Sequence, residues 1–340
     1  MKFFEDVCQV TFGGIDHVFN VSSTFCEFNL GGNDITIKWY GVIIAFGFTL
    51  AVLFGGRMAY KWKMDLNKML DVLIYGTFAA IIGARLYFCI FNWDHYRADP
   101  IRILYIWEGG LAIYGGIIGG ILAAFVVCKI EKLNFYNLLD MAGMSLLIGQ
   151  GIGRWGNYAN QEAFGCNTNG NFGMMSSKVS EYIIRNQADL PGVDPYVPVH
   201  PTFFYESVWC IAGFLLLFLM CKKFRKFSGQ IFLGYGIWYG LGRMIIEGLR
   251  TDSLYVGNTS IRVSQLLSML IVLVCAVLMI IKIIKYSKNP QPIEGVDYFV
   301  EPVPFFKKNR EKLEKEKAES ENKQDVTEET QEVTEDVHKD

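Results

Sequence analysis

Residues that commonly bind metal ions are few in this sequence and widely scattered. The 340 residues include four histidines and eight cysteines, and none of them follows the spacing of a metal site. The sequence therefore predicts no metal centre. Cysteines inside apolar runs are expected to act as small buried hydrophobic residues. Cys8 and Cys26 lie ahead of these runs, and the sequence leaves open whether they pair.

Long polar segments that could enclose a large apolar core in water are also missing. Hydrophobic residues make up 51% of the chain, the mean hydropathy is positive, and only the C-terminal end is strongly polar. A soluble protein with fully buried helices is therefore excluded. Residues 1–36 lack the apolar core of a cleavable signal peptide. They are predicted to form short strands or an element at the membrane interface.

The apolar residues gather into seven runs, each close to the length of about 20 residues that crosses a bilayer as a helix. The runs are Trp39–Gly56, Met69–Phe91, Leu111–Ile130, Leu138–Gly153, Phe203–Cys221, Ile231–Ile246 and Val263–Ile284. The sequence predicts an all-α integral membrane protein with seven transmembrane helices in a catalytic domain over residues 37–285. Residues 1–36 are the predicted extracytoplasmic N-terminal segment, and residues 286–340 a largely disordered, charged cytoplasmic tail.

Lysine and arginine are concentrated in alternate connections between the runs, and this bias orients the helices. Cytoplasmic loops carry the excess of positive charge in membrane proteins. The pattern therefore predicts the N-terminus outside and the C-terminus in the cytoplasm. The cations follow the first, third, fifth and seventh runs, as Arg57, Lys61, Lys63, Lys68, Lys129, Lys132, Lys222, Lys223, Arg225, Lys226, Lys282, Lys285 and Lys288.

Three arginines lie near the predicted outer ends of different helices. They are Arg85, Arg154 and Arg243, and the last helix continues through Glu247 and Arg250. A single arginine at this depth is ordinarily ion-paired or reaches toward the interface. Three of them favour a shared anion, because a guanidinium group binds two phosphate oxygens and stays charged in apolar surroundings. The anion expected at this depth is a phospholipid headgroup.

Polar residues and glycines share the stretch GIGRWGNYANQEAFG, residues 151–165, directly after an apolar run. Irregular backbone at membrane depth occurs only where it is buried in protein or lines a cavity. The stretch is therefore predicted to form the wall of a polar cavity that opens toward the outer leaflet. Glycines four apart in the other runs are expected to let helices pack closely.

Six motifs in order along the chain resemble those of the prolipoprotein diacylglyceryl transferase family. They are IKWYG, GARLYF, GGLAIYGGIIGG, GRWGNYANQEAFG, HPTFFYES and GRMIIEGLRTD, and the likeness covers about residues 37–284. This family transfers the diacylglyceryl group of phosphatidylglycerol to the lipobox cysteine of a prolipoprotein and releases glycerol phosphate, without a cofactor. The resemblance implies a bacterial cell membrane enzyme. Its partners would be phosphatidylglycerol and prolipoprotein signal peptides with a lipobox cysteine, and no nucleic acid.

The predicted site combines residues implied by the resemblance with residues chosen for their chemistry. The expected catalytic residues are Tyr40, Tyr114, Arg154, Asn157, Glu162 and Arg243. The expected headgroup-binding residues are Arg85, Arg154, Gly165, His200, Arg243, Glu247 and Arg250. A transporter of phospholipid or of an anionic solute is the alternative function, although the sequence shows no repeat symmetry of the kind many transporters have.

The group that takes the proton from the substrate thiol is left open among three residues. Many family members carry a histidine where this chain has Tyr114, and the ordinary tyrosine pKa of about 10 makes a poor base. His200 precedes a proline and is expected to order a loop. Glu162 is expected to be the ion-pair partner of the arginines. Our hypothesis is that no single strong base exists, that the arginines lower the thiol pKa, and that Tyr114 orients the headgroup.

Overall fold

The computed structural model describes residues 7–30, 33–97, 99–188, 190, 192–251, 262–289 and 293. Residues 1–296 form one compact unit, and residues 297–340 form a second that lies outside the described part of the chain. Most of the predicted charged tail, 286–340, therefore lies outside the description as well.

Each of the seven predicted runs corresponds to a helix, although the third run begins two residues before its helix, at Leu111. These helices are α1 Trp39–Lys61, α2 Leu66–Phe91, α4 Ile113–Ile130, α5 Phe135–Asn160, α7 Thr202–Lys223, α8 Gln230–Glu247 and α9 Val263–Lys288. Five of them, α1, α2, α4, α7 and α9, are long and apolar enough to cross a membrane. The chain is therefore a mostly helical protein of the integral membrane class.

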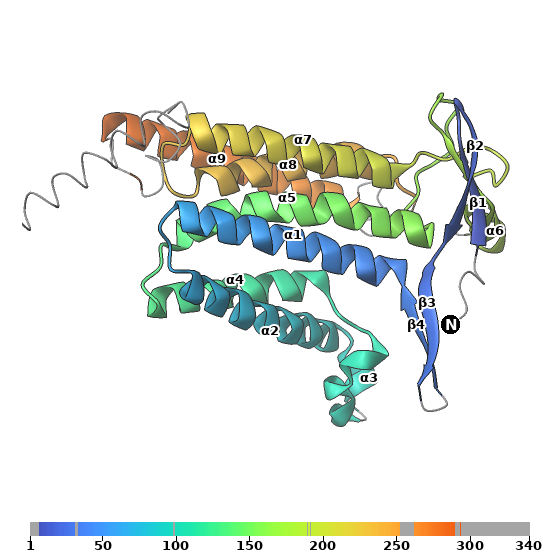
Figure 1. Cartoon of the computed structure of the whole chain (residues 1–340), viewed down its shortest axis with the longest axis horizontal. Coiled ribbons are helices and arrows are strands. Elements are labelled where there is room, and N and C mark those ends of the chain that lie inside the picture. The colour runs from blue at the N-terminus through green and yellow to red at the C-terminus, as the bar shows by residue number, and fades with distance from the viewer. Residues whose placement is uncertain are drawn as a thin grey trace, which may run out of the picture. The chain divides into compact units, whose positions relative to one another are not determined.

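The more polar helices α5 and α8 are packed among the apolar ones. Helix α5 contacts α1, α7 and α8, while α8 also contacts α7 and α9 (Figure 1). Helices α2 and α4 form a pair of their own, in which a Cβ atom on Gly83 or Gly115 would meet the carbonyl oxygen of the other. The small residues at this crossing therefore allow the close approach that the sequence predicted for the glycine-rich run.

The polar stretch at residues 151–165 differs from the irregular segment that was expected. Helix α5 continues through Asn160, so residues 151–160 are helical. The helix ends at Gln161, whose φ of 55° is left-handed, and Ala163 has a φ of 57°. Gly151 and Gly156 leave room for side chains of α7 and α1 against a regular helix, and irregular backbone begins only at Gln161.

Strands at one end of the helices show that the description all-α was incomplete. Strand β1, Val7–Phe12, pairs with β2, Ile15–Ser22, and with β5, Met174–Ser176. Strands β3, Thr24–Leu30, and β4, Asn33–Lys38, form a separate hairpin that leads into α1 (Figure 1). The N-terminal segment therefore forms strands, which was one of the two structures expected for it. The thiols of Cys8 on β1 and Cys26 on β3 are both unbridged.

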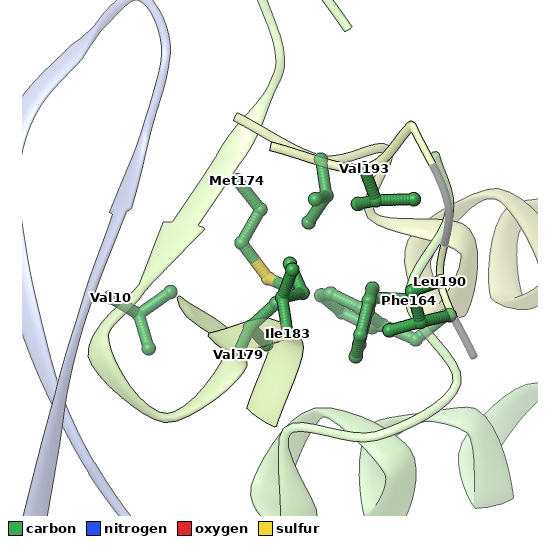
Figure 2. Packing of buried hydrophobic residues seen from close by; sticks show 9 residues of the cluster. Val10, Phe164, Met174, Val179, Ile183, Leu190 and Val193 are labelled. Atoms are coloured by element: carbon green, nitrogen blue, oxygen red, sulfur yellow. The ribbon is translucent and has the colours of Figure 1, made fainter. Parts of the chain in front are cut away.

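A small hydrophobic core joins the three-stranded sheet to the segment after α5. It is built between β1, β5 and helix α6, Ser177–Arg185, together with the loops on either side and the first turn of α7 (Figure 2). Its buried members are Val10, Phe164, Met174, Val179, Ile183, Leu190, Val193, Val199 and Phe203. Because Phe164 directly precedes Gly165, this core anchors the end of the polar stretch.

Candidate functional site

A buried glutamate, Glu206 on α7, connects arginines from two other parts of the chain. Its Oε2 lies 2.6 Å from Nη2 of Arg154 on α5. Its Oε1 lies 3.5 Å from Nη1 of Arg243 on α8 and 3.4 Å from Nη1 of Arg250, which follows α8. The side chain of Glu206 is only 6% exposed. A carboxylate so buried is stable only with such charge partners.

Each of the two helical arginines has a further partner on its own helix. Arg243 Nη2 lies 2.6 Å from Oε2 of Glu247, one turn later on α8. Arg154 Nη1 donates to Oδ1 of Asn157 at 3.4 Å. The side chains of Arg154 and Arg243 are each 20% exposed, so the cluster is shielded but can still be reached.

Glu206 was not among the residues predicted from the sequence. Glu206 could have been identified from the sequence, because the arginines require a carboxylate partner at the same depth. Glu206 lies one residue before the end of the motif HPTFFYES, at the start of a run predicted to be a membrane helix. An acidic residue in such a run has a functional or ion-paired role by default.

The expected ion pair between Glu162 and the arginines is replaced by amide contacts. Oε1 of Glu162 accepts hydrogen bonds from Nδ2 of Asn157 at 3.0 Å and from Nδ2 of Asn160 at 3.4 Å. Within the described part of the chain, the carboxylate that pairs with Arg154 belongs to Glu206 instead. Asn157 therefore links Glu162 to Arg154 through its two side-chain atoms.

Tyr40 is brought against the same stretch of α5 by a glycine. A Cβ atom added to Gly156 would lie 2.8 Å from Cδ2 of the Tyr40 ring. Gly156 lies between Arg154 and Asn157 in sequence. The close approach that glycine allows here therefore places Tyr40 next to the arginine-bearing turn, as the grouping in the predicted site requires.

Gly165 and His200 form a junction that fixes the end of the polar stretch. The amide of Gly165 donates to the carbonyl of His200 at 2.9 Å, and the next amide donates to the carbonyl of Leu249 at 2.7 Å. A Cβ atom on Gly165 would lie 2.7 Å from Cβ of His200 and 3.0 Å from the oxygen of Leu249. Only glycine fits at this crossing of three segments.

The imidazole of His200 has a structural partner rather than an arginine. Its Nδ1 lies 3.3 Å from the hydroxyl oxygen of Tyr205. Burial lowers the pKa of His200 below its ordinary value, so the ring is neutral at pH 7. These contacts favour the loop-ordering role expected for His200.

Arg85 lies apart from the arginine cluster and is occupied by backbone carbonyl groups. Its Nε donates to the carbonyl of Ile103 at 2.9 Å. The two Nη atoms donate to the carbonyls of Arg102 at 2.6 Å, Tyr105 at 3.0 Å, Gly109 at 2.5 Å and Gly110 at 3.2 Å. Arg85 is almost fully buried. The geometry favours a structural role in holding the connection between α2 and α4, in place of the expected contact with a headgroup.

Tyr114 stands at the start of α4, directly after the connection that Arg85 holds. Its ring centroid lies 6.4 Å from that of Tyr87 on α2, and the side chain is exposed. Its described contacts are thus with the α2–α4 pair. The structure therefore brings together Tyr40, Arg154, Asn157, Glu162, Arg243, Glu247 and Arg250, and places Arg85 and Tyr114 on the other helix pair.

Comparison with known proteins assigns this arrangement to one family. A family model described as prolipoprotein diacylglyceryl transferase matches residues 27–281. The phosphatidylglycerol–prolipoprotein diacylglyceryl transferase of Listeria welshimeri is 43% identical over 253 residues, which cover 74% of this chain and 88% of the relative. The protein of the same name from Staphylococcus aureus strain Newman is 40% identical over 263 residues, covering 76% and 89%. The chain belongs to the prolipoprotein diacylglyceryl transferase family, as the sequence motifs predicted.

Proposed function

We propose that the cluster around Glu206 binds phosphatidylglycerol by its phosphate and transfers the diacylglyceryl group to a prolipoprotein cysteine. The observation that carries the proposal is the convergence of Arg154, Arg243 and Arg250 on one buried carboxylate. Three guanidinium groups so held can turn toward a phosphate without first being desolvated. The names of the relatives supply phosphatidylglycerol and a prolipoprotein as the substrates.

The reaction balances with the groups that this site offers. The thiolate of the lipobox cysteine attacks the carbon of the diacylglyceryl group that bears the phosphate oxygen. A carbon–sulfur bond forms, the carbon–oxygen bond breaks, and its electron pair leaves on the phosphate as glycerol phosphate. Because the leaving group gains one negative charge, Arg154 and Arg243 stabilise the transition state more than the bound lipid.

In this proposal the thiol proton passes to water, and no strong base of the protein accepts it. His200 faces Tyr205, and Glu162 is held by two side-chain amides. A free cysteine has a pKa of about 8.5, and nearby positive charge lowers that value. The guanidinium groups of Arg154 and Arg243, rather than a base, then favour the thiolate. Tyr114 contributes by orienting the substrate at the start of α4.

We also propose that α5 and α8 cross the membrane together with the five apolar helices. Arg154 on α5 and Arg243 on α8 both contact Glu206, Gln150 on α5 contacts Tyr235 on α8, and the apolar helices α1, α7 and α9 pack against the two helices. With seven spans, the distribution of lysine and arginine supports an N-terminus outside the bacterial cell membrane and a C-terminus in the cytoplasm. The site then lies at the outer leaflet.

Purified protein in phosphatidylglycerol vesicles tests this function directly. A peptide with a lipobox cysteine is added, and glycerol phosphate release and peptide mass are measured together. We expect equimolar glycerol phosphate and diacylglyceryl peptide, and neither product with a peptide whose cysteine is replaced by serine. Movement of labelled lipid across the bilayer without either product would support the transporter instead.

A further inference from the structure

A polar pair connects α5 and α8 below the arginine cluster. Nε2 of Gln150 donates to the hydroxyl oxygen of Tyr235 at 2.9 Å. Gln150 precedes Arg154 by one helical turn, which places it about 6 Å farther from the outer end of α5. Both side chains are half-buried among apolar helices. We call these two residues the Gln150–Tyr235 pair.

The pair is continuous with the site through Tyr239. The rings of Tyr235 and Tyr239 are stacked, with centroids 5.7 Å apart and planes 12° apart. Tyr239 precedes Arg243 by one turn of α8, so along this helix it lies between the Gln150–Tyr235 pair and the arginine cluster. Tyr239, Tyr235 and Gln150 therefore form a row of neutral polar side chains that extends inward from the charged cluster along the contact between α5 and α8.

One hydrogen-bonding atom of the pair has no partner in the structure. Oε1 of Gln150 is buried and accepts no hydrogen bond within the described part of the chain. Turning the amide by 180° lets the Tyr235 hydroxyl donate to Oε1 but leaves the amide N–H groups unpartnered instead. In either orientation the pair makes one hydrogen bond and leaves one buried polar atom of the amide without a hydrogen-bond partner, which is unfavourable.

We propose that the Gln150–Tyr235 pair binds an ester carbonyl of the diacyl lipid whose phosphate the arginines hold. This inference rests on the proposed function. The ester groups of a phospholipid lie a few covalent bonds from the phosphate, on its membrane side. This separation matches the one helical turn on α5 between Arg154 and Gln150. An ester carbonyl only accepts hydrogen bonds, so it satisfies the amide N–H groups once the amide has turned and Tyr235 donates to Oε1.

The neutral Gln150–Tyr235 pair suits an ester ligand better than a charged side chain at this position would. An ester carries no charge, and a charged side chain farther from the interface would be costly. The chemistry also separates this role from a purely structural tie between α5 and α8. A structural tie is indifferent to whether the lipid carries ester or ether linkages, while an ester subsite distinguishes them.

The test compares diacyl phosphatidylglycerol with its dialkyl ether analogue of equal chain length, each in vesicles with the lipobox peptide. The wild-type protein is expected to favour the ester lipid in kcat/KM by about two- to tenfold, the effect of one neutral hydrogen bond. Gln150→Leu removes the amide, and Tyr235→Phe removes the hydroxyl while keeping the ring stack. Both are expected to bring the ratio close to one, mainly by raising KM for the ester lipid.

Tyr136→Phe is the matched control, because Tyr136 lies at the opposite end of α5 with an exposed ring. It should leave the ester-to-ether ratio unchanged. An unchanged ratio in a folded Gln150→Leu or Tyr235→Phe variant would overturn the subsite, as would equal use of both lipids by the wild-type protein. Absence of transfer from either lipid by the wild-type protein would instead overturn the proposed function.

Discussion

Replacement of Arg154 by lysine tests whether the guanidinium geometry, and not only its charge, supports transfer. Two nitrogen atoms of Arg154 contact different partners, Nη2 with Glu206 at 2.6 Å and Nη1 with Asn157 at 3.4 Å. A lysine has one nitrogen on a flexible chain and cannot reach both partners and a phosphate oxygen in one geometry. The variant therefore loses at least one hydrogen bond to a charged group.

The loss of one such bond costs about 1.5–3 kcal/mol, which corresponds to about 10- to 150-fold in kcat/KM. Initial rates of glycerol phosphate release from phosphatidylglycerol vesicles measure it. Arg185→Lys is the control, since Arg185 is 74% exposed and pairs only with Glu181 on its own helix in the described structure. If Arg154→Lys retains the rate of this control, binding of phosphate through two guanidinium nitrogens is the wrong role for Arg154.

Five further variants, the last two used as a pair, test other parts of the structure. Glu206→Gln should lower kcat about five- to tenfold, because a neutral acceptor holds the arginines less firmly, while KM for the lipid should not rise; unchanged kcat would contradict this. Arg85→Lys should lower the midpoint of thermal unfolding and leave KM for the lipid unchanged, and a raised KM at an unchanged midpoint would restore the headgroup role. Tyr114→Phe should slow transfer modestly, whereas complete inactivity of the folded variant would identify its hydroxyl as the base. Tyr196→Cys should react with an impermeant thiol reagent in intact cells and Lys226→Cys only after permeabilisation, and the reverse pattern would invert the topology.

The helices could be predicted from the sequence because length and apolar composition decide whether a segment crosses a bilayer. The run predicted at Ile231–Ile246 falls within α8, and the run at Val263–Ile284 begins at the first residue of α9. The end of α5 could not be predicted in this way. Its last turns are polar, and they stay helical because packing with Tyr40 and with α7 stabilises them.

The site was predicted less completely, because depth along a helix does not say which way a side chain points. Arg85 and Arg154 were both predicted near the outer ends of their helices, yet Arg85 contacts backbone carbonyl groups and Arg154 contacts Glu206. The carbonyl groups belong to a connection between α2 and α4 whose conformation no periodicity specifies. Pairing of the arginines also depends on the packing of α7 against α5, which brings Glu206 into reach.

The distances around Glu206 indicate how the cluster could accept an anion without being dismantled. Oε2 is held by Arg154 at 2.6 Å, while Oε1 is shared by Arg243 and Arg250 at 3.5 and 3.4 Å, which are weak contacts. The short partner of Arg243 is Glu247, at 2.6 Å. Arg243 can therefore turn Nη1 from Glu206 to a phosphate oxygen and keep its pairing with Glu247. On the proposed function, Glu206 Oε1 marks the position at which the phosphate enters, and the carboxylates keep the arginines apart and oriented until it does.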